Sequence, residues 1–476
     1  MSRRWSAAGL IDLVLDDGSF QSWDQPVDIR DHSEGYQEEL RRAAARAGTD
    51  ESVLTGRGLV RGRPVAVVVN EFAFLGGSIG MAAAERIVSA VRRATLEGLP
   101  LLATTASGGT RMQEGTPAFF QMAEISRAVM AHRAAGLAYL VHLRHPTTGG
   151  VYASWGSLGH VTVAEPGALV GFLGPKVYEA LEGFPFPEGV QRAENLAEKG
   201  VIDAVVATED LPALIDLILA VLVDPAVPPS LPLRAPGGGT QLPVWDAVAL
   251  TRDAQRLGVR DLLRYGARGT LALNGTEEGE QDAAVLVTLT RLDGQPCVLV
   301  GQDRRQQAPL GAAALREARR GMRLAEELGL PLVTVIDTPG AELSVAAEEG
   351  AVAGEIARCI AALSTMTVPT VSVILGQGCG GGALALLPAQ VVVATENAWL
   401  SPLPPEGASV IRYGDLSHAA EMAESQGIGS AALMEAGIVH RVVPELAEDD
   451  PESLSIAVAA TVAHELALLA GGPLAG

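Results

Sequence analysis

Residues 98–110 read GLPLLATTASGGT, and residues 329–341 read GLPLVTVIDTPGA. The two stretches lie 231 positions apart and share one layout: glycine and proline, an apolar run, then a turn that contains glycine. A short apolar run bounded by such residues is typical of a buried strand. The repeat therefore predicts that one strand-and-turn unit occurs twice in the chain.

Three further pairs of segments match in the same order and at nearly the same offset. Residues 77–97 and 309–329 both have the pattern of an amphipathic helix that precedes the shared strand. The other two pairs are 136–154 with 367–386, and 193–206 with 431–443. Four matches in one order predict a tandem duplication.

Proline and glycine gather between the two copies, in DPAVPPSLPLRAPGGGTQLP at residues 224–243. This composition is typical of a linker. We expect a first domain over 1–225, a linker over 226–240 and a second domain over 241–476. Each half alternates short apolar runs with stretches rich in alanine, glutamate and arginine, which predicts an α/β fold.

Composition excludes several classes of function. The formal net charge of −21 argues against nucleic acid as a partner, because phosphate contacts need a basic surface. The three cysteines form no CxxC pair, which argues against a zinc ribbon and favours a reducing compartment.

No spacing of metal-ligating residues suggests a metal site. Asp12 interrupts the first apolar stretch, so we expect no signal peptide, no membrane span and a cytoplasmic protein.

Glycine-bearing turns follow two predicted strands in each half, and neighbouring parallel strands can bring such turns together at one edge. Their backbone N–H groups would form an oxyanion hole, reinforced by the start of a helix. Two holes suit a reaction in which two substrates each develop a negative oxygen. The residues expected to form them are Gly109, Thr110, Gly149 and Gly150 in the first half, and Gly340, Ala341, Gly381 and Gly382 in the second.

Other polar residues near these turns have ordinary structural interpretations. Cys379 is expected to be a small filler residue, because no histidine lies near it in sequence. His142 and His145 flank a strand end, where packing or solvent contact is the expected role. Asp337 and Glu406 are expected to act as turn and cap residues.

The motifs in combination resemble a known enzyme family. ASGGTRMQEG, HPTTGGVYAS, AEPGALVGFLGPKV and FPEGVQRAENLAEKGVID are similar to the beta subunit of bacterial acetyl-CoA carboxylase carboxyltransferase. VIDTPGAE, GQGCGGGALAL, ENAWLSPLPPEGASVI and EAGIVHRVVPE are similar to its alpha subunit. The chain thus resembles a fused beta/alpha carboxyltransferase of the crotonase superfamily, and the resemblance covers roughly residues 50–210 and 280–445.

The resemblance implies two tandem crotonase-like domains, each a ββα spiral. It also implies that a carboxyl group moves from N-carboxybiotin to the α-carbon of acetyl-CoA or a related acyl-CoA, giving malonyl-CoA or a homologue, as in fatty acid biosynthesis. The first-half amides would hold the thioester enolate and the second-half amides the ureido oxygen of biotin, whose anion would take the α-proton. The expected assembly is a homodimer or a trimer of dimers, with an active centre that uses both kinds of half.

The resemblance also suggests residues that contact the substrate: Ser107, Gly108, Arg111 and Ala383. For Arg111 two roles stay open, a contact to a phosphate of coenzyme A or an ion pair within the protein. The acyl chain length stays open too. The chain lacks the four-cysteine ribbon common in the beta subunit, and Gln377 and Cys379 replace expected residues of the alpha-type glycine run.

Several absences point to separate partners. Neither Lys176 nor Lys199 lies between two methionines, so biotin is not expected to be attached to this chain. No GxxxxGK[ST] loop for ATP phosphates occurs. The expected partners are therefore a biotin carboxyl carrier protein, a biotin carboxylase and an acyl-CoA substrate.

Three alternative functions remain. A decarboxylase of malonyl-CoA or a malonyl thioester would stabilise the same enolate in the reverse direction. A biotin-free hydratase or isomerase would need one domain and a pair of acidic residues, so the duplicated turns count against it. A non-catalytic scaffold subunit of an acyl-CoA carboxylase complex would have no need of intact glycines at all four turns.

Overall fold

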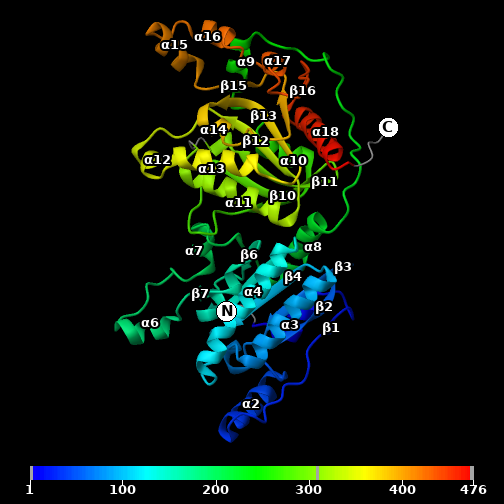
Figure 1. Cartoon of the computed structure of the whole chain (residues 1–476), viewed down its shortest axis with the longest axis vertical. Coiled ribbons are helices and arrows are strands. Elements are labelled where there is room, and N and C mark those ends of the chain that lie inside the picture. Colours follow the sequence, from blue (N-terminus) through cyan, green and yellow to red (C-terminus); the bar gives the residue numbers. More distant parts are fainter. Residues whose placement is uncertain (1–3, 307–309, 472–476) are drawn as a thin grey trace. The chain divides into compact units, whose positions relative to one another are not determined.

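The structure is a computed structural model that describes residues 4–306 and 310–471. The chain divides into two compact units (Figure 1). The first comprises residues 1–223 with 277–279, and the second comprises residues 224–276 with 280–476.

The elements of the first unit alternate between helices and strands as the sequence predicts. They are α1 (Ala7–Val14), β1 (Gln21–Ser22), α2 (Glu34–Ala47), β2 (Val53–Val60), β3 (Arg63–Asn70), α3 (Met81–Glu97), β4 (Leu101–Ser107), α4 (Gly115–Ala134), β5 (Tyr139–Thr148), α5 (Gly149–Tyr152), β6 (Val161–Ala164), β7 (Val170–Gly171), α6 (Pro175–Glu182), α7 (Ala193–Glu198), β8 (Ala204–Val205) and α8 (Leu211–Leu222).

From the second strand of each unit onward, the second unit repeats the order of the first with two further helices. Its elements are α9 (Val244–Thr251), α10 (Val259–Gly266), β9 (Ala267–Leu273), β10 (Val285–Leu292), β11 (Gln295–Gln302), α11 (Ala312–Leu328), β12 (Leu332–Thr338), α12 (Val345–Glu349), α13 (Val352–Ser364), β13 (Thr370–Cys379), α14 (Gly380–Leu384), β14 (Val391–Thr395), β15 (Trp399–Ser401), α15 (Pro405–Tyr413), α16 (Ala419–Ser425), α17 (Ser430–Glu435), β16 (Arg441–Val443) and α18 (Pro451–Leu469).

In each unit the described strands form one eight-stranded mixed sheet. The orders are β1-β2-β3-β4-β5-β6-β8 with β7 beside β5, and β9-β10-β11-β12-β13-β14-β16 with β15 beside β13. Strand pairs are antiparallel up to β3 and β11 and parallel beyond them. Central parallel strands are covered on both faces, and every residue of β4 and β12 is buried. The predicted α/β class is confirmed.

The repeated GLP sequence marks the point at which a helix ends and a buried strand begins. Gly98 follows α3 with φ 66°, and Gly329 follows α11 with φ 63°. Glycine adopts this left-handed conformation without strain, and its N–H closes the last turn of the helix. The prolines at 100 and 331 cannot continue a helix, so β4 and β12 begin directly after them.

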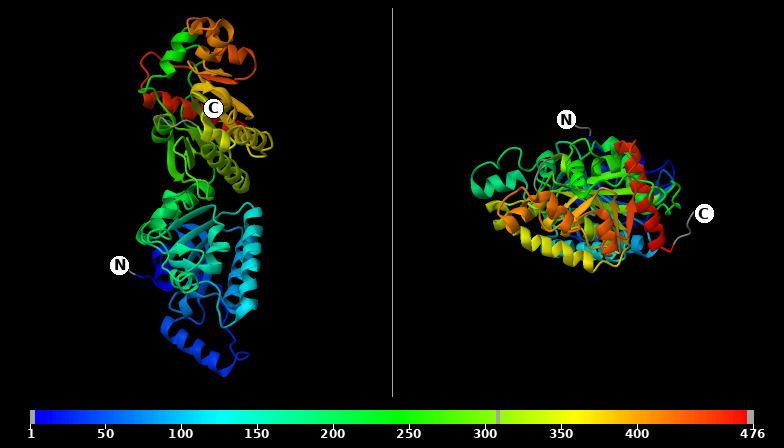
Figure 2. Two further views of the ribbon diagram at one scale, coloured as in Figure 1. Left: turned by 90° about the vertical axis from the view of Figure 1, so that its left-hand side faces the viewer. Right: turned by 90° about the horizontal axis from the view of Figure 1, so that it is seen from above.

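Helices cover both faces of each sheet. In the first unit, α3 and α4 lie side by side on one face (Figure 1). Helices α1 and α8 pack on strands β2 and β3 from the other face. The left view of Figure 2 shows the cyan helix α4 running along its sheet. In the second unit, α11 and α13 pack together on one face, and α10 and α18 pack on the other.

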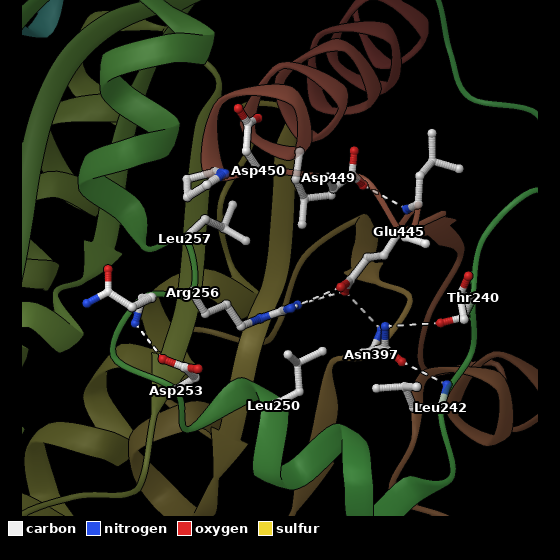
Figure 3. A pocket seen from close by; sticks show the side chains of 15 residues that line it. Thr240, Leu242, Leu250, Asp253, Arg256, Leu257, Asn397, Glu445, Asp449 and Asp450 are labelled. Carbon is white, nitrogen blue, oxygen red and sulfur yellow. Dashed lines mark hydrogen bonds and ion pairs between the residues drawn. The ribbon is translucent and has the colours of Figure 1, made fainter.

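The segment between the two copies, residues 224–243, is held along the second unit by specific bonds. The guanidinium of Arg234 donates from Nη2 to Oδ1 of Asp449 over 2.6 Å. The N–H of Leu242 donates to Oδ1 of Asn397 over 3.0 Å (Figure 3). Despite its linker-like composition, this segment is part of the surface of the second unit.

Among the described residues, one helix, α18, is long and apolar enough to cross a membrane. Its most apolar window is 61% buried inside the structure, and the helix packs against α10 and the second sheet. This packing is that of a core helix in a globular unit.

We predict that Gly321→Ala destabilises the second unit although alanine favours helices. Gly321 lies in α11, and a Cβ there would be 2.4 Å from Cγ2 of Val300 and 3.0 Å from Cγ1 of Val287. Overpacking should lower the free energy of unfolding by about 1–3 kcal/mol, more than the gain in helix propensity.

Gly35→Ala in α2 is the matched control, because a Cβ there meets no atom within 4 Å. It should raise the free energy of unfolding by up to about 1 kcal/mol. Urea denaturation measures both variants, and an unchanged or stabilised Gly321→Ala protein would contradict the close contact.

Candidate active site

Two chain turns meet at the carboxyl ends of β4 and β5 in the first unit. Gly109 has φ 106°, and a Cβ on it would lie 3.1 Å from the N atom of Gly150. Gly149 has φ 62°, and a Cβ on it would lie 3.1 Å from the O atom of Gly108. The two backbones are therefore in direct contact, and larger residues would separate them.

Some N–H groups of these turns already have acceptors. The N–H of Gly109 donates to Oγ of Ser107 over 3.0 Å. The N–H of Gly149 donates to the carbonyl O of Phe172 over 3.0 Å. These two amides are occupied, so they are poor candidates for binding an oxyanion.

Two N–H groups remain available in the first unit, those of Thr110 and Gly150. Neither has an acceptor within residues 4–306 and 310–471. They lie close together, because a Cβ on Gly150 would be 3.0 Å from Oγ1 of Thr110. Two free donors at one point are the minimum that an oxyanion hole requires.

The second unit repeats this arrangement at the ends of β12 and β13. Gly340 has φ 136°, and its N–H donates to Oγ1 of Thr338 over 3.1 Å. A Cβ on Gly382 would lie 3.0 Å from the N atom of Ala341, so this turn also touches the start of a helix. The N–H groups of Ala341 and Gly381 have no acceptor in the described part of the chain.

The free donors occupy corresponding positions of the duplication. Ala341 follows Thr110 by 231 positions, and Gly381 follows Gly150 by the same interval. The structure therefore brings all four predicted turns together in two equivalent pairs. It also shows which amide of each turn is available, a distinction that the sequence pattern does not make.

An apolar pocket of about 970 Å³ adjoins the glycine turn of the first unit. Exposed aromatic side chains, Phe119, Phe120 and Phe172, contribute to its lining, and Met122 on α4 packs near Gly150. A pocket of this size and polarity suits an apolar ligand with a small polar group held at the turn.

A second pocket of about 610 Å³ lies beside the turn of the second unit and includes Thr338, Pro339 and Gln377. Three arginines also line it, and each is paired: Arg252 with Glu406 at 2.6 Å, Arg305 with Asp261 at 2.6 Å, and Arg304 with Asp337 at 3.4 Å. These pairings neutralise much of the positive charge.

A third pocket, of about 360 Å³, lies elsewhere in the second unit and contains none of the predicted site residues (Figure 3). Its centre is occupied by an ion pair in which Nη2 of Arg256 lies 2.7 Å from Oε1 of Glu445. The N–H of Asn397 donates to Glu445, and its side chain accepts the N–H of Leu242. The polar groups of this pocket therefore hold the protein's own chain together.

The structure places Arg111 in a buried ion pair. Its side chain is 1% exposed and that of Glu51 is 2% exposed, and Nη1 of Arg111 donates to Oε2 of Glu51 over 2.9 Å. Burial opposes the charge, but the bonds to Glu51 outweigh it, so the pKa of Arg111 lies above its ordinary value. This geometry favours the internal ion pair over the contact to a coenzyme A phosphate.

The other residues expected to contact substrate also have structural surroundings. Oγ of Ser107 donates to the carbonyl of Gly77 over 2.6 Å, and the N–H of Gly108 donates to that of Gly76 over 2.9 Å. Ala383 is fully buried in α14. Their part is to shape the turns.

The structure gives Cys379, His142 and Glu406 the structural roles expected of them. Burial raises the pKa of the Cys379 thiol to about 11, which makes it a poor nucleophile. His142 is fully buried, and burial lowers its pKa to about 3. Glu406 is bound to Arg252. Asp337 is different, since it is a buried carboxylate beside the second turn that accepts a bond from the N–H of Gln377.

We predict that Arg111→Met lowers the free energy of unfolding by about 3–5 kcal/mol, because it leaves Glu51 buried and unpaired. The double variant Arg111→Met with Glu51→Met should recover part of this loss, since the buried charge of Glu51 is then absent, while Glu114 keeps only its other bonds. Chemical denaturation of the two single variants and the double variant gives the coupling energy. A loss below about 1 kcal/mol in Arg111→Met would contradict the buried pair.

We predict a pH-dependent contribution of Asp337 to stability. Burial raises its pKa from 3.8 to about 6, and the Arg304 guanidinium opposes this shift. The folded state thus binds the proton more tightly, so the stabilising contribution is complete below pH 3.8 and is lost as the pH rises through about 6. The stability of the wild type relative to Asp337→Asn should fall over this range, and a pH-independent difference would refute the assignment.

Comparisons with known proteins agree with this architecture. The family model described as carboxyl transferase domain matches residues 6–462. A probable biotin-dependent acyl-coenzyme A carboxylase beta3 subunit of Mycobacterium tuberculosis is 56% identical over 95% of this chain and 92% of its own length. Acetyl-coenzyme A carboxylase carboxyl transferase subunits beta/alpha of Salinispora arenicola are 38% identical over 90% of this chain and 80% of that protein.

Solved structures show the same fold. The transcarboxylase 12S hexamer core with hydrolysed methylmalonyl-coenzyme A bound superposes with a TM-score of 0.79 at 22% identity, covering 99% of this chain and 91% of that one. A single-chain, multi-domain long-chain acyl-CoA carboxylase gives a TM-score of 0.71 at 20% identity over 96% of this chain and 45% of that one. The chain therefore belongs to the carboxyl transferase family: it is an enzyme component of the biotin-dependent acyl-CoA carboxylase type, built from two tandem crotonase-like domains.

Proposed function

We propose that the protein transfers a carboxyl group from N-carboxybiotin, presented by a separate carrier protein, to the α-carbon of acetyl-CoA or a related acyl-CoA. The product would be malonyl-CoA or a homologue. The observation that carries this proposal is the pair of free backbone N–H groups found once in each unit, at corresponding positions of the duplication. A carboxyl transfer needs two such sites, because both reacting partners pass through an anionic oxygen.

In the first unit, the N–H groups of Thr110 and Gly150 would hold the enolate oxygen of the thioester. Backbone donors that are fixed before the reaction stabilise such a charge without reorganisation. The apolar pocket beside them offers aromatic surface for the acyl-CoA. The coenzyme A carboxylases named among the relatives support an acyl-CoA as the substrate class.

In the second unit, the N–H groups of Ala341 and Gly381 would hold the ureido oxygen of biotin. Biotin supplies the carried carboxyl group and, once that group has left, a base for the α-proton. In this division of labour, the transfer needs no side-chain base at the free amides. Neither lysine of the chain, Lys176 or Lys199, has the sequence context of a biotinylated lysine.

The proposal includes partners and assembly. A biotin carboxyl carrier protein and a biotin carboxylase would supply carboxybiotin, and the protein would work in the cytoplasm as a homodimer or a trimer of dimers. The transcarboxylase 12S core, which has the same fold, assembles as a hexamer, and this supports the larger of the two oligomers.

The test is carboxyl exchange between malonyl-CoA and free biotin, repeated with acetyl-, propionyl- and butyryl-CoA as acceptors. We predict that Gly150→Val and Gly381→Val each lower kcat by about 10²–10³-fold, because each displaces one donor of an oxyanion hole. A Cβ on Gly150 would crowd Oγ1 of Thr110, and one on Gly381 would lie 2.8 Å from Cδ1 of Ile356. Gly35→Ala, which adds a Cβ that meets no atom within 4 Å, should exchange at the wild-type rate.

The same assay separates the alternatives. Loss of CO₂ from malonyl-CoA without any dependence on biotin would identify a decarboxylase instead. If both valine variants fold and exchange at the wild-type rate, the reaction does not use these amides. If the wild type catalyses neither exchange nor decarboxylation, the protein is a scaffold.

A further inference from the structure

A buried glutamine joins the two segments that form the second site. Gln302 is the last residue of β11, and its side chain is 2% exposed. Its Oε1 accepts a hydrogen bond from the N–H of Asp337 over 3.0 Å, and its Nε2 donates to the carbonyl O of Gly382 over 2.7 Å. One side chain therefore bridges the end of β12 and the first turns of α14.

The amide side chain suits this position. It must accept a hydrogen bond at one end and donate one at the other, which neither a carboxylate nor an apolar group can do. The carbonyl of Gly382 lies in a helix of five residues, where carbonyl groups lack partners further along the helix. Gln302 supplies that partner and so fixes the orientation of this peptide group.

Asp337 extends the bridge to β13. The register between β12 and β13 shifts between Ile336 and Thr338, as in a β-bulge, which disrupts the regular ladder of hydrogen bonds. Oδ1 of Asp337 accepts the N–H of Gln377 over 3.1 Å at this point. The chain of contacts from Gly382 through Gln302 and Asp337 thus ties together both segments that carry the free amides.

The first unit forms the same fold without this bridge. Asn70 ends β3 as Gln302 ends β11, but its Nδ2 donates to the carbonyl of Ser52 over 3.4 Å and its Oδ1 is a buried atom with no partner in the described chain. Ala106 stands where the second unit has Asp337, so no carboxylate is present there. Since the fold does not require the bridge, it serves something particular to the second unit.

We propose that Gln302 is a positioning residue of the second site, which holds the N–H groups of Ala341 and Gly381 at the spacing needed to bind the ureido oxygen of biotin. This inference rests on the proposed function for its ligand. Gln302 acts through Asp337 and Gly382 and touches no reacting atom.

The test uses two variants of similar shape in the full chain, Gln302→Met and Gln302→Glu. The first removes both hydrogen bonds, and the second places a carboxylate against the carbonyl of Gly382. We expect kcat for malonyl-CoA–biotin exchange to fall about 10–100-fold in both, since small displacements of preorganised donors are costly. The Kd for acyl-CoA, which binds at the first unit, should stay unchanged.

Thr334→Val is the matched control. Thr334 lies on β12 and is 1% exposed, and its Oγ1 donates to the carbonyl of Leu386 over 2.7 Å, just beyond α14. The control therefore loses a buried hydrogen bond to the same region without touching the bridge. Its folded form should catalyse exchange at the wild-type rate, even if the substitution lowers the free energy of unfolding.

Hydrogen–deuterium exchange provides a readout that does not depend on activity. The bonded amides of Gly340 and Ala385, which lie in the two segments, should lose protection in both Gln302 variants and keep it in Thr334→Val. Unchanged protection, or folded Gln302 variants with wild-type kcat, would overturn the inference.

An equal loss of kcat in Thr334→Val would show that Gln302 has only a general structural role. A wild type that shows no exchange with biotin would instead overturn the proposed function, while the protection data would still decide whether Gln302 positions these segments.

Discussion

The candidate sites depend on one backbone feature, the parallel pairing of β4 with β5 and of β12 with β13. In both pairs the register shifts close to the carboxyl ends of the strands. This shift lets the turn after one strand press against the start of the helix after the other, at a separation that only glycine permits. The resulting donors are peptide groups, and in each unit the sheet of that unit holds them in place. Their position therefore follows from the fold.

The two units reach this geometry by different chemistry. In the second unit, the N–H of Gln377 next to the register shift is accepted by the Asp337 carboxylate. The residue corresponding to Gln377 in the first unit is Pro146, which has no N–H, and Ala106 stands in place of the aspartate. Each copy has thus satisfied the same irregular backbone in its own way, and only the second has a buried carboxylate at this position of the strand.

Much of the fold and the outline of the site could be predicted from the sequence, because glycine and proline mark the ends of its helices and strands locally. The occupied amides also had a local signal, since Ser107 and Thr338 each stand two residues before the glycine whose N–H they accept. Gln302 and the burial of Arg111 had none. Asp337 lies 35 positions from Gln302, and Glu51 lies 60 positions from Arg111, so these pairs meet only when strands and helices pack.

The segment rich in proline and glycine has a practical meaning for anyone who wishes to produce the second unit separately. Arg234 is bonded to Asp449, and Nη1 of Arg291 donates to the carbonyl of Pro225 over 3.0 Å. A fragment that starts after this segment would leave Asp449 without its arginine and Arg291 without that carbonyl. The place to cut the polypeptide is therefore ahead of Asp224, so that the fragment keeps the whole proline- and glycine-rich segment.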